Sequence, residues 1–184
     1  KNRLCDAYTI TFGVTANPPY KQQVAATVVD KNYHRQFNHL AILDAETAWA
    51  NSQGDGIKVA VIDTGVNYQH PYLSSNIAIN EKEIPNNGID DDKNGFTDDV
   101  IGWDFINNDS TPFDDNGHGT HVAGLIAANT FGVAPKAKIL PIKVFNAEGS
   151  CELGNIIMGF LYAIDQGANV INFSGGHNFY RWKC

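Results

Sequence analysis

Three runs of apolar residues, separated by polar turns, dominate the chain from residue 57 onward. They read IKVAVID (57–63), ILPIKVF (139–145) and ANVINF (168–173). Each run is nearly continuous and rich in Val and Ile, which is typical of strands buried on both faces of a parallel sheet. The pattern therefore predicts a parallel strand at each of these positions.

A helical pattern lies between the second and third runs, in GNIIMGFLYAIDQG (154–167). Its apolar residues recur every three or four positions, which predicts a helix that packs on the sheet and ends at Gly167. The predicted core-facing residues are Ile156, Ile157, Phe160, Leu161 and Ile164. A strand, a helix and a strand in this order form a right-handed crossover, so we expect an α/β protein with a central parallel sheet.

Two other segments are predicted to be helical. In DDNGHGTHVAGLIAA (114–128), apolar side chains at Val122, Leu125 and Ile126 indicate a core helix that starts near His118. Either residue 116 (Asn) or residue 117 (Gly) is available as its N-cap. Asp44 is the predicted N-cap of a shorter helix in AETAWAN (45–51).

Asp63 and His118 are the candidate catalytic residues. Functional side chains of parallel sheets collect at the carboxyl ends of strands, and Asp63 closes the first apolar run. His118 suits a general base, because a helix N-terminus disfavours imidazolium whereas a nearby carboxylate favours it and fixes the ring tautomer. We therefore expect the two side chains to meet. In the alternative interpretation Asp63 caps a turn and His118 is structural, as we expect for His121, packed and hydrogen-bonded.

Two other kinds of site are disfavoured. The Asp-Thr-Gly triplet at 63–65 also occurs in aspartic peptidases, but those are all-β proteins with two such carboxylates, and this chain has one copy beside long helical patterns. His118 and His121 have a His-x-x-His spacing. The glutamate of the HExxH zinc motif is absent, however, and the spacing indicates no third ligand.

Composition and charge limit the number of domains and the kinds of binding partner that we expect. The chain has 184 residues, 43% of them hydrophobic, which predicts one globular domain, and its formal net charge is −7. Eleven acidic residues fall between positions 81 and 115, so the charge points to a bound cation rather than to nucleic acid or an anionic membrane. No apolar run approaches the ~20 residues of a membrane helix. Three widely spaced cysteines, Cys5, Cys151 and Cys184, indicate neither a disulfide framework nor a CxxC metal site.

The acidic stretch NNGIDDDKNGFTDD (86–99) contains a candidate calcium loop. Its residues follow the ligand positions of such a loop, with Gly95 at the position that requires a sharp turn. The candidate ligands are Asp90, Asp92, Asn94, Phe96 and Asp98. Ile101 stands where a standard EF-hand has glutamate, so that motif is excluded. Crowded carboxylates repel one another without a cation, which favours Ca²⁺ over the alternative of a solvated acidic loop.

Four sequence blocks together resemble the subtilisin-like serine peptidases. They are VAVIDTGV (59–66), GHGTHVAGLIAA (117–128), GVAPKAKILPIKVF (132–145) and NVINFSGG (169–176), in the order of that family. The resemblance runs from Gln36 to Gly176. It implies a three-layer fold with a central parallel sheet, incomplete here because the family's C-terminal strands and helices are missing. It also implies a secreted or extracytoplasmic protein that acts on peptide or protein substrates, as a monomer.

The resemblance also implies roles for individual residues. Asp63 would orient His118, and His118 would take a proton from a serine and return it to the leaving amine. The residues that would bind an extended substrate are Gly149, Ser150, Ser174, Gly175 and Gly176. Ser174 is not the nucleophile in this scheme. Cys151 stands where a glycine is common and would narrow a subsite, and the family's calcium loop after the HGTHVAG helix is shortened to NTF.

The nucleophile of the family has no counterpart in these 184 residues. They contain neither the GTSxA block with the serine nor the asparagine that supplies an oxyanion donor. We therefore expect residues 39–176 to be a partial peptidase domain that is inactive alone. Residues 1–38 would be an N-terminal extension or propeptide remnant, and residues 177–184 a divergent tail. The alternative is a non-catalytic, calcium-stabilised peptide-binding scaffold or pseudoprotease.

Overall fold

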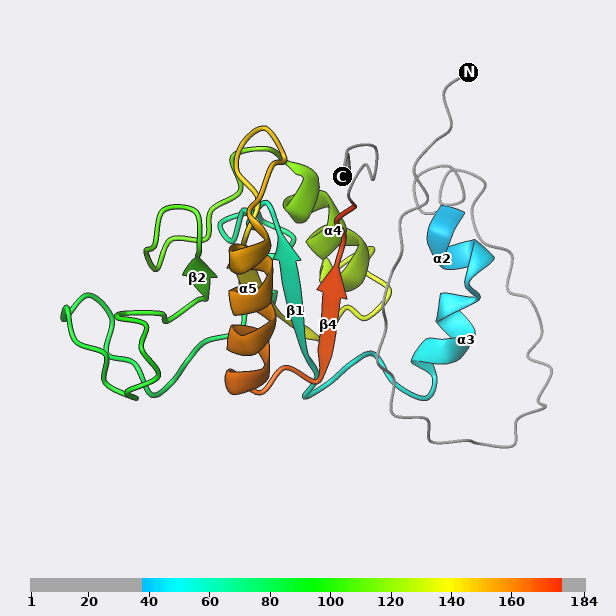
Figure 1. The fold of residues 1–184 in the computed structure, drawn as a ribbon. Helices are drawn as coiled ribbons and strands as arrows, with labels where there is room; N and C mark the ends of the chain where they lie inside the picture. The colour runs from blue at the N-terminus through cyan, green and yellow to red at the C-terminus, as the bar shows by residue number, and fades with distance from the viewer. Residues whose placement is uncertain (1–37, 177–184) are drawn as a thin grey trace, which may run out of the picture.

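A four-stranded sheet forms the centre of the computed structural model, which describes residues 38–176 (Figure 1). The strands are β1 (Lys58–Asp63), β2 (Trp103–Asp104), β3 (Lys138–Lys143) and β4 (Val170–Phe173). The three predicted strands are thus confirmed, and β2 is an addition that is too short to leave an apolar pattern. The predicted tail and nearly all of the predicted N-terminal extension lie outside the described residues.

All strand pairs in the sheet are parallel, and the strand order is β2-β3-β1-β4. β1 lies between β3 and β4, so that Asp63 is in register with Lys143 and its neighbour Ile62 is in register with Phe173. The carboxyl ends of β1, β3 and β4 therefore lie together at one edge of the sheet. This arrangement confirms the predicted α/β class.

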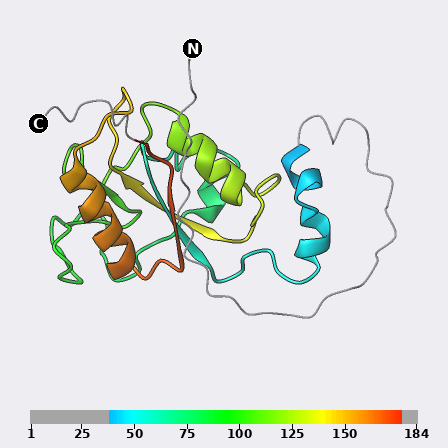
Figure 2. The same cartoon turned by 45° about the vertical axis from the view of Figure 1, so that its right-hand side comes forward.

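Two long helices cover opposite faces of the sheet. They are α4 (His118–Ala127) and α5 (Leu153–Asp165), and Figure 2 shows them on the two sides of the strands. Because side chains of a strand alternate between faces, β1 contributes to both cores. The α4-side cluster includes Val59, Val61, Ala123 and Ala127, and the α5-side cluster includes Ala60, Ile62, Tyr162 and Ala163. The described residues thus form three layers, helix, sheet and helix.

Two short helices, α2 (Asn38–Ile42) and α3 (Ala45–Trp49), precede the sheet. The Trp49 Nε1 donates to the carbonyl of Val133 at 2.7 Å, which ties α3 to the loop after α4. The predicted N-cap of α3 is confirmed in position. Asp44 occupies the N-cap position with a left-handed backbone (φ 51°), and its carboxylate accepts from the Thr47 hydroxyl at 2.9 Å. A single-turn 3₁₀ helix, η1 (Ser74–Asn76), follows β1.

None of the helices within residues 38–176 could cross a membrane, since none combines sufficient length with sufficient apolar character. The longest helix of this part, α5, has 13 residues. A bilayer-spanning helix needs ~20.

The face that α5 turns to the sheet differs from the prediction. Ile157, Leu161 and Ile164 were predicted to be buried, but they are 52%, 55% and 65% exposed. The buried residues are instead Gly159, Tyr162 and Ala163, while the predicted Ile156 and Phe160 are partly buried against the same cluster. A side chain at residue 159 would come within 2.9 Å of Val144, so the helix axis lies very near the sheet, and only small residues fit there. The close contact at Gly159 therefore determines which part of α5 lies on the sheet, and Ile157, Leu161 and Ile164 lie outside that contact.

The same correction applies to α4. Its buried residues are small and recur on one side of the helix: Gly119, Ala123, Gly124 and Ala127. Of the predicted core residues, Val122 and Ile126 are partly buried against the core, whereas Leu125 is 37% exposed. The periodicity identified both helices correctly but misplaced part of the face that each one buries.

Substitutions on the two sides of α5 should distinguish its exposed face from its buried face by their effect on stability. We expect Leu161→Gln to change the free energy of unfolding by no more than about 0.5 kcal/mol, because the residue it replaces is exposed. Ala163→Leu should cost about 1–3 kcal/mol, because the added atoms have no space against the sheet. Urea unfolding of the two variants and the wild type measures both values. A larger loss for Leu161→Gln than for Ala163→Leu would contradict this orientation of α5.

Candidate active site

Asp63 ends β1 and is fully buried. Val59 and Val61 on the same strand pack in the cluster under α4. Since side chains two residues apart point to the same face, Asp63 also faces the α4 side of the sheet. Its position follows from the strand alternation and brings it to the start of α4.

His118 is the first residue of α4, and its Nδ1 lies 2.8 Å from Oδ1 of Asp63. A carboxylate only accepts hydrogen bonds, so Nδ1 carries the proton and Nε2 is the ring atom left for proton transfer. The backbone N–H of Thr64 donates to the same Asp63 oxygen at 2.7 Å and fixes the carboxylate. The His118 side chain is 51% exposed. The structure thus brings the two predicted residues together from positions 55 residues apart in the chain.

The backbones at Gly65 and Gly119 are in close contact, which allows His118 to reach Asp63. A Cβ at Gly119 would lie 2.1 Å from the carbonyl oxygen of Gly65 and 3.1 Å from Oδ1 of Asp63. Gly65 itself has φ +100°, a conformation that L side chains rarely adopt. Any side chain at residue 119 would push the start of α4, and His118 with it, away from Asp63.

Asp114 caps α4 and was not predicted. The predicted cap position is correct in that Gly117 is the N-cap, but glycine offers no side-chain acceptor. The buried Asp114 carboxylate accepts instead from the backbone N–H groups of Asn116, Gly117 and Thr120 and from the Thr64 hydroxyl. Burial raises the pKa of Asp114, and the hydrogen bonds from Thr120, Gly117 and Thr64 outweigh burial, so that its pKa is below the usual value.

Lys143 is a second polar residue that the sequence pattern did not reveal. It closes β3 beside Asp63 and is only 1% exposed. Its Nζ donates to the carbonyl of Thr64 at 2.7 Å and to the carbonyl of Phe145 at 3.0 Å, and it forms an ion pair with Asp115 at 2.6 Å. The ammonium therefore joins the ends of β1 and β3 to the loop that precedes His118.

His121 is exposed, so the prediction of a packed structural histidine is wrong. Because α4 starts at residue 118, residue 121 lies one turn later, on the side away from the sheet. It lines a cavity of about 610 Å³, together with His39, His70, Tyr72 and Phe131 among other residues. Among residues 38–176, these imidazoles do not gather closely enough to form a metal-ligand group.

The predicted substrate-binding residues lie in loops that follow β3 and β4. Gly149 and Ser150 lie in a turn closed by a hydrogen bond from the Asn146 N–H to the Ser150 carbonyl at 2.9 Å. Gly175 packs so near Phe145 and Phe173 that a Cβ there would come within 2.6 Å of each ring. The two loops leave the same edge of the sheet on either side of Asp63.

The other predicted residues after β4 are Ser174 and Gly176. The Ser174 hydroxyl accepts from the side-chain amide of Asn172 at 2.9 Å, and Gly176 is exposed at the end of the described chain. Cys151, predicted to narrow a subsite, is exposed beside residues 149 and 150. These residues thus belong to the loops after β3 and β4, the two strands that flank β1.

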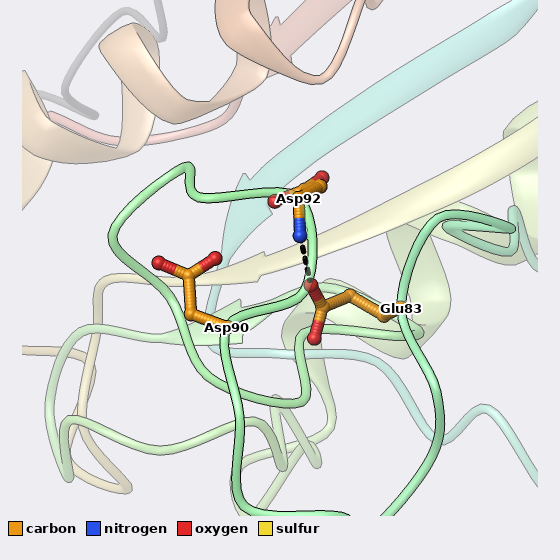
Figure 3. A group of neighbouring side chains, drawn as sticks. All are labelled: Glu83, Asp90 and Asp92. Carbon is orange, nitrogen blue, oxygen red and sulfur yellow. Dashed lines mark hydrogen bonds between the residues drawn. The ribbon is translucent and has the colours of Figure 1, made fainter.

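The acidic segment folds into a loop on the α5 side of the sheet. Carboxylate oxygens of Glu83, Asp90 and Asp92 lie within 4.8 Å of one another, and Figure 3 shows these side chains gathered in the loop. Glu83 is buried, and its Oε1 accepts from the backbone N–H of Asp92 at 3.1 Å. Glu83 was not a predicted ligand because it lies outside the regular spacing of the loop.

The remaining predicted ligands take different positions. Asn94 N–H donates to Asp90 at 3.0 Å, and Phe96 N–H donates to the side-chain oxygen of Asn94 at 2.7 Å, so these residues follow the turn of the loop. The Asp98 carboxylate accepts from the N–H groups of residues 87 and 88 at 3.0 Å each. Asp98 therefore holds the preceding loop segment, whereas Glu83 joins Asp90 and Asp92.

Asp99 and Tyr162 join the acidic loop to α5. The Tyr162 hydroxyl donates to Oδ2 of Asp99 at 2.6 Å, and Asn80 and Asn94 donate to the same carboxylate. Burial raises the pKa of Asp99 despite these donors, and burial beside Asp99 also raises the pKa of Tyr162. The bond connects two residues that lie 63 positions apart in the chain.

A buried aspartate that fixes the Nδ1–H of a histidine is the arrangement by which serine-type peptidases orient their general base. The subtilase family matches residues 54–183 of the chain. This range covers more than half of the 184 residues, and the chain belongs to the subtilase family, whose members are serine-type peptidases. The predicted family is thereby confirmed.

Several proteins of this family are similar to the chain. Thermitase of Thermoactinomyces vulgaris is 40% identical over 140 residues, which cover 73% of this chain and 42% of thermitase. Subtilisin-like protease 1 of Plasmodium berghei is 38% identical over 71% of this chain and 23% of its own length. The thermophilic serine proteinase of Bacillus sp. (strain AK1) is 35% identical over 88% of this chain and 36% of its own length.

A solved structure of a cold adapted subtilisin-like serine proteinase is 32% identical to the chain, with a TM-score of 0.48. The match covers 65% of this chain and 35% of that protein. The chain therefore spans less than half the length of each of the relatives named here.

The Asp114 cap gives a stability that depends on pH. Because the folded pKa of Asp114 is below its unfolded value of about 3.9, its contribution is full above about pH 4 and is lost as the pH falls through the lower folded pKa. Asp114→Asn should therefore lower the free energy of unfolding at pH 7 by about 1.5–3 kcal/mol and have a smaller effect at pH 3. Urea unfolding at both pH values measures this.

The matched control is Asp165→Asn, which removes an exposed carboxylate at the end of α5. It should change stability by less than about 0.5 kcal/mol at either pH. An Asp114→Asn effect that stays constant between pH 7 and pH 3 would show that the charge of Asp114 does not stabilise the cap.

Proposed function

We propose that this chain is the Asp–His part of a subtilisin-like serine endopeptidase that hydrolyses peptide bonds in peptide or protein substrates. The 2.8 Å contact between Asp63 and His118 supports this proposal most directly. In the proposed reaction, Nε2 of His118 accepts the proton of a serine hydroxyl as that oxygen attacks the carbonyl carbon. The same nitrogen then protonates the leaving amine, while Asp63 stabilises the imidazolium.

Substrate would bind in extended form along the loops after β3 and β4. In this proposal Gly149 and Ser150 form one side of the cleft, and Ser174, Gly175 and Gly176 form the other. Their common position beside the end of β1 supports this, because a peptide between the loops would pass next to His118. Secretion and a monomeric state remain predictions from the family resemblance.

We also propose that residues 1–184 are inactive by themselves. The chain contains no GTSxA block, so no serine is identified whose hydroxyl could give its proton to His118. We therefore expect no hydrolysis of a chromogenic peptide anilide and no labelling by a fluorophosphonate probe. Hydrolysis by the purified chain that is abolished in His118→Ala would contradict this expectation and would support an unrecognised nucleophile.

A chimera provides the control for the catalytic roles. Residues 54–176 replace the matching segment of thermitase, and thermitase supplies the serine-bearing remainder. The chimera should hydrolyse the anilide. His118→Ala should lower its kcat about 10⁶-fold and Asp63→Ala about 10⁴-fold, the magnitudes known for subtilisin, a member of the same family. A folded chimera whose kcat is unchanged by His118→Ala would contradict the proposed role of His118.

Calcium binding by the acidic loop is a second part of the proposed function. The donor set fits Ca²⁺, which prefers several carboxylate and carbonyl oxygens in a flexible loop. Of the five predicted ligands, Asp90, Asp92, Asn94 and the Phe96 carbonyl would bind the ion, whereas Asp98, which accepts from residues 87 and 88, would not. Glu83 would supply the further carboxylate that a standard calcium loop carries at its last position. Bound Ca²⁺ would neutralise the mutual repulsion of these carboxylates.

Calcium should therefore stabilise the folded chain. Saturating Ca²⁺ at about 100 times its Kd adds about 2.7 kcal/mol to the free energy of unfolding. Asp92→Asn should remove most of this gain, whereas Glu148→Gln, an exposed acid outside the loop, should retain it. Calorimetric titration and thermal unfolding with and without Ca²⁺ measure the effect. Absence of both binding heat and stabilisation in the wild type would refute the site.

A further inference from the structure

The Thr64 hydroxyl joins the two backbone segments that carry Asp63 and His118. It is 3% exposed, donates to Oδ1 of Asp114 at 2.8 Å, and accepts from the backbone N–H of Gly119 at 2.9 Å. Thr64 directly follows Asp63, and Gly119 directly follows His118. The hydroxyl therefore connects the backbone beside the carboxylate to the backbone beside the imidazole.

We propose that Thr64 is a positioning residue whose hydroxyl keeps the His118 imidazole within hydrogen-bond distance of the Asp63 carboxylate. This inference rests on the proposed function and assigns a task within it. The backbone N–H of Thr64 already fixes Oδ1 of Asp63 at 2.7 Å. One residue thus controls both partners, the carboxylate through its main chain and the helix start through its side chain.

The Thr64 hydroxyl acts as a donor to one partner and as an acceptor from the other. A hydroxyl has one proton, and Thr64 gives it to the Asp114 carboxylate, so a lone pair of Oγ1 remains for Gly119. Asp114 also accepts from Gly117 and Thr120 in the first turn of α4. The helix start is therefore held on both sides of His118, and removal of the hydroxyl leaves a buried N–H without its acceptor.

Other contacts also join the two segments, since the Asn67 N–H donates to the Thr120 hydroxyl at 2.9 Å and Lys143 bonds to both Thr64 and Asp115. These bonds hold the helix two residues beyond His118 and the loop before it, whereas the Thr64 hydroxyl bonds to the residue next to His118. The packing of Gly119 against the Gly65 carbonyl prevents a closer approach. The His118 ring is about half exposed, so little packing fixes it apart from its bond to Asp63. The alignment of the imidazole with the carboxylate therefore depends on where the backbone places residue 118.

Thr64→Ser and Thr64→Ala form a matched pair that differs by a single oxygen atom. Nitrogen NMR of the His118 ring, at a pH where the imidazole is neutral, reports which nitrogen carries the proton. We expect the Nδ1–H tautomer to dominate in the wild type and in Thr64→Ser, and a mixture with the Nε2–H tautomer in Thr64→Ala. Thr64→Val, which keeps the side-chain size, should behave like Thr64→Ala. The rings of His39, His70 and His121 serve as internal controls.

Kinetics of the thermitase chimera give an independent readout. Thr64→Ala should lower kcat by up to about 100-fold with KM unchanged, since a displacement of about 1 Å can have this effect, and Thr64→Ser should restore most of it. A merely structural role would lower stability in urea without altering the tautomer or kcat of the folded fraction. A folded Thr64→Ala or Thr64→Val variant with wild-type tautomer and kcat would refute the positioning role.

The same NMR measurement distinguishes an error in the proposed function from an error in the role of Thr64. If the wild type itself lacks the Nδ1–H tautomer and Asp63→Asn changes nothing, the Asp63–His118 pair does not operate in solution. In that case the proposed function fails before Thr64 is considered. If Asp63→Asn changes the tautomer but Thr64→Ala does not, only the positioning role is wrong.

Discussion

The close approach of two backbones, the turn after β1 and the first turn of α4, is the constraint on which the site depends. At Gly119 a single additional carbon atom would lie 2.1 Å from the Gly65 carbonyl, so the approach is possible only without a side chain. Once it is made, the strand end and the helix start share hydrogen bonds through Thr64 and Asp114. Asp63 and His118 face each other because of this contact.

Much of the fold could be predicted from the sequence, because buried parallel strands leave nearly continuous apolar runs. The Asp63–His118 contact followed from the rule that functional groups collect at strand ends. The faces of α4 and α5 could not be predicted fully, because hydrophobicity does not report how near a helix lies to its sheet. At Gly159 the separation leaves no space for a side chain, and the bulky Leu161 turns outward.

Other site residues were missed because their partners are distant in the sequence. Asp114 and Lys143 look like ordinary polar residues in the chain, and only the folded structure shows that both are buried, Lys143 beside Asp63 and Asp114 against Thr64. Glu83 joins Asp90 and Asp92 from outside the regular ligand spacing. Spacing rules find ligands within one loop, and they do not find groups that tertiary structure adds.

The buried ammonium of Lys143 has a practical consequence. Its three acceptors and its 1% exposure shield it from reagents that acylate amines, while Lys136 and Lys138 are exposed to them. Acylation at this one lysine would therefore report transient separation of the strand ends, at the place where the Asp63–His118 pair is assembled. Lys143 can thus report local opening without the introduction of a new residue.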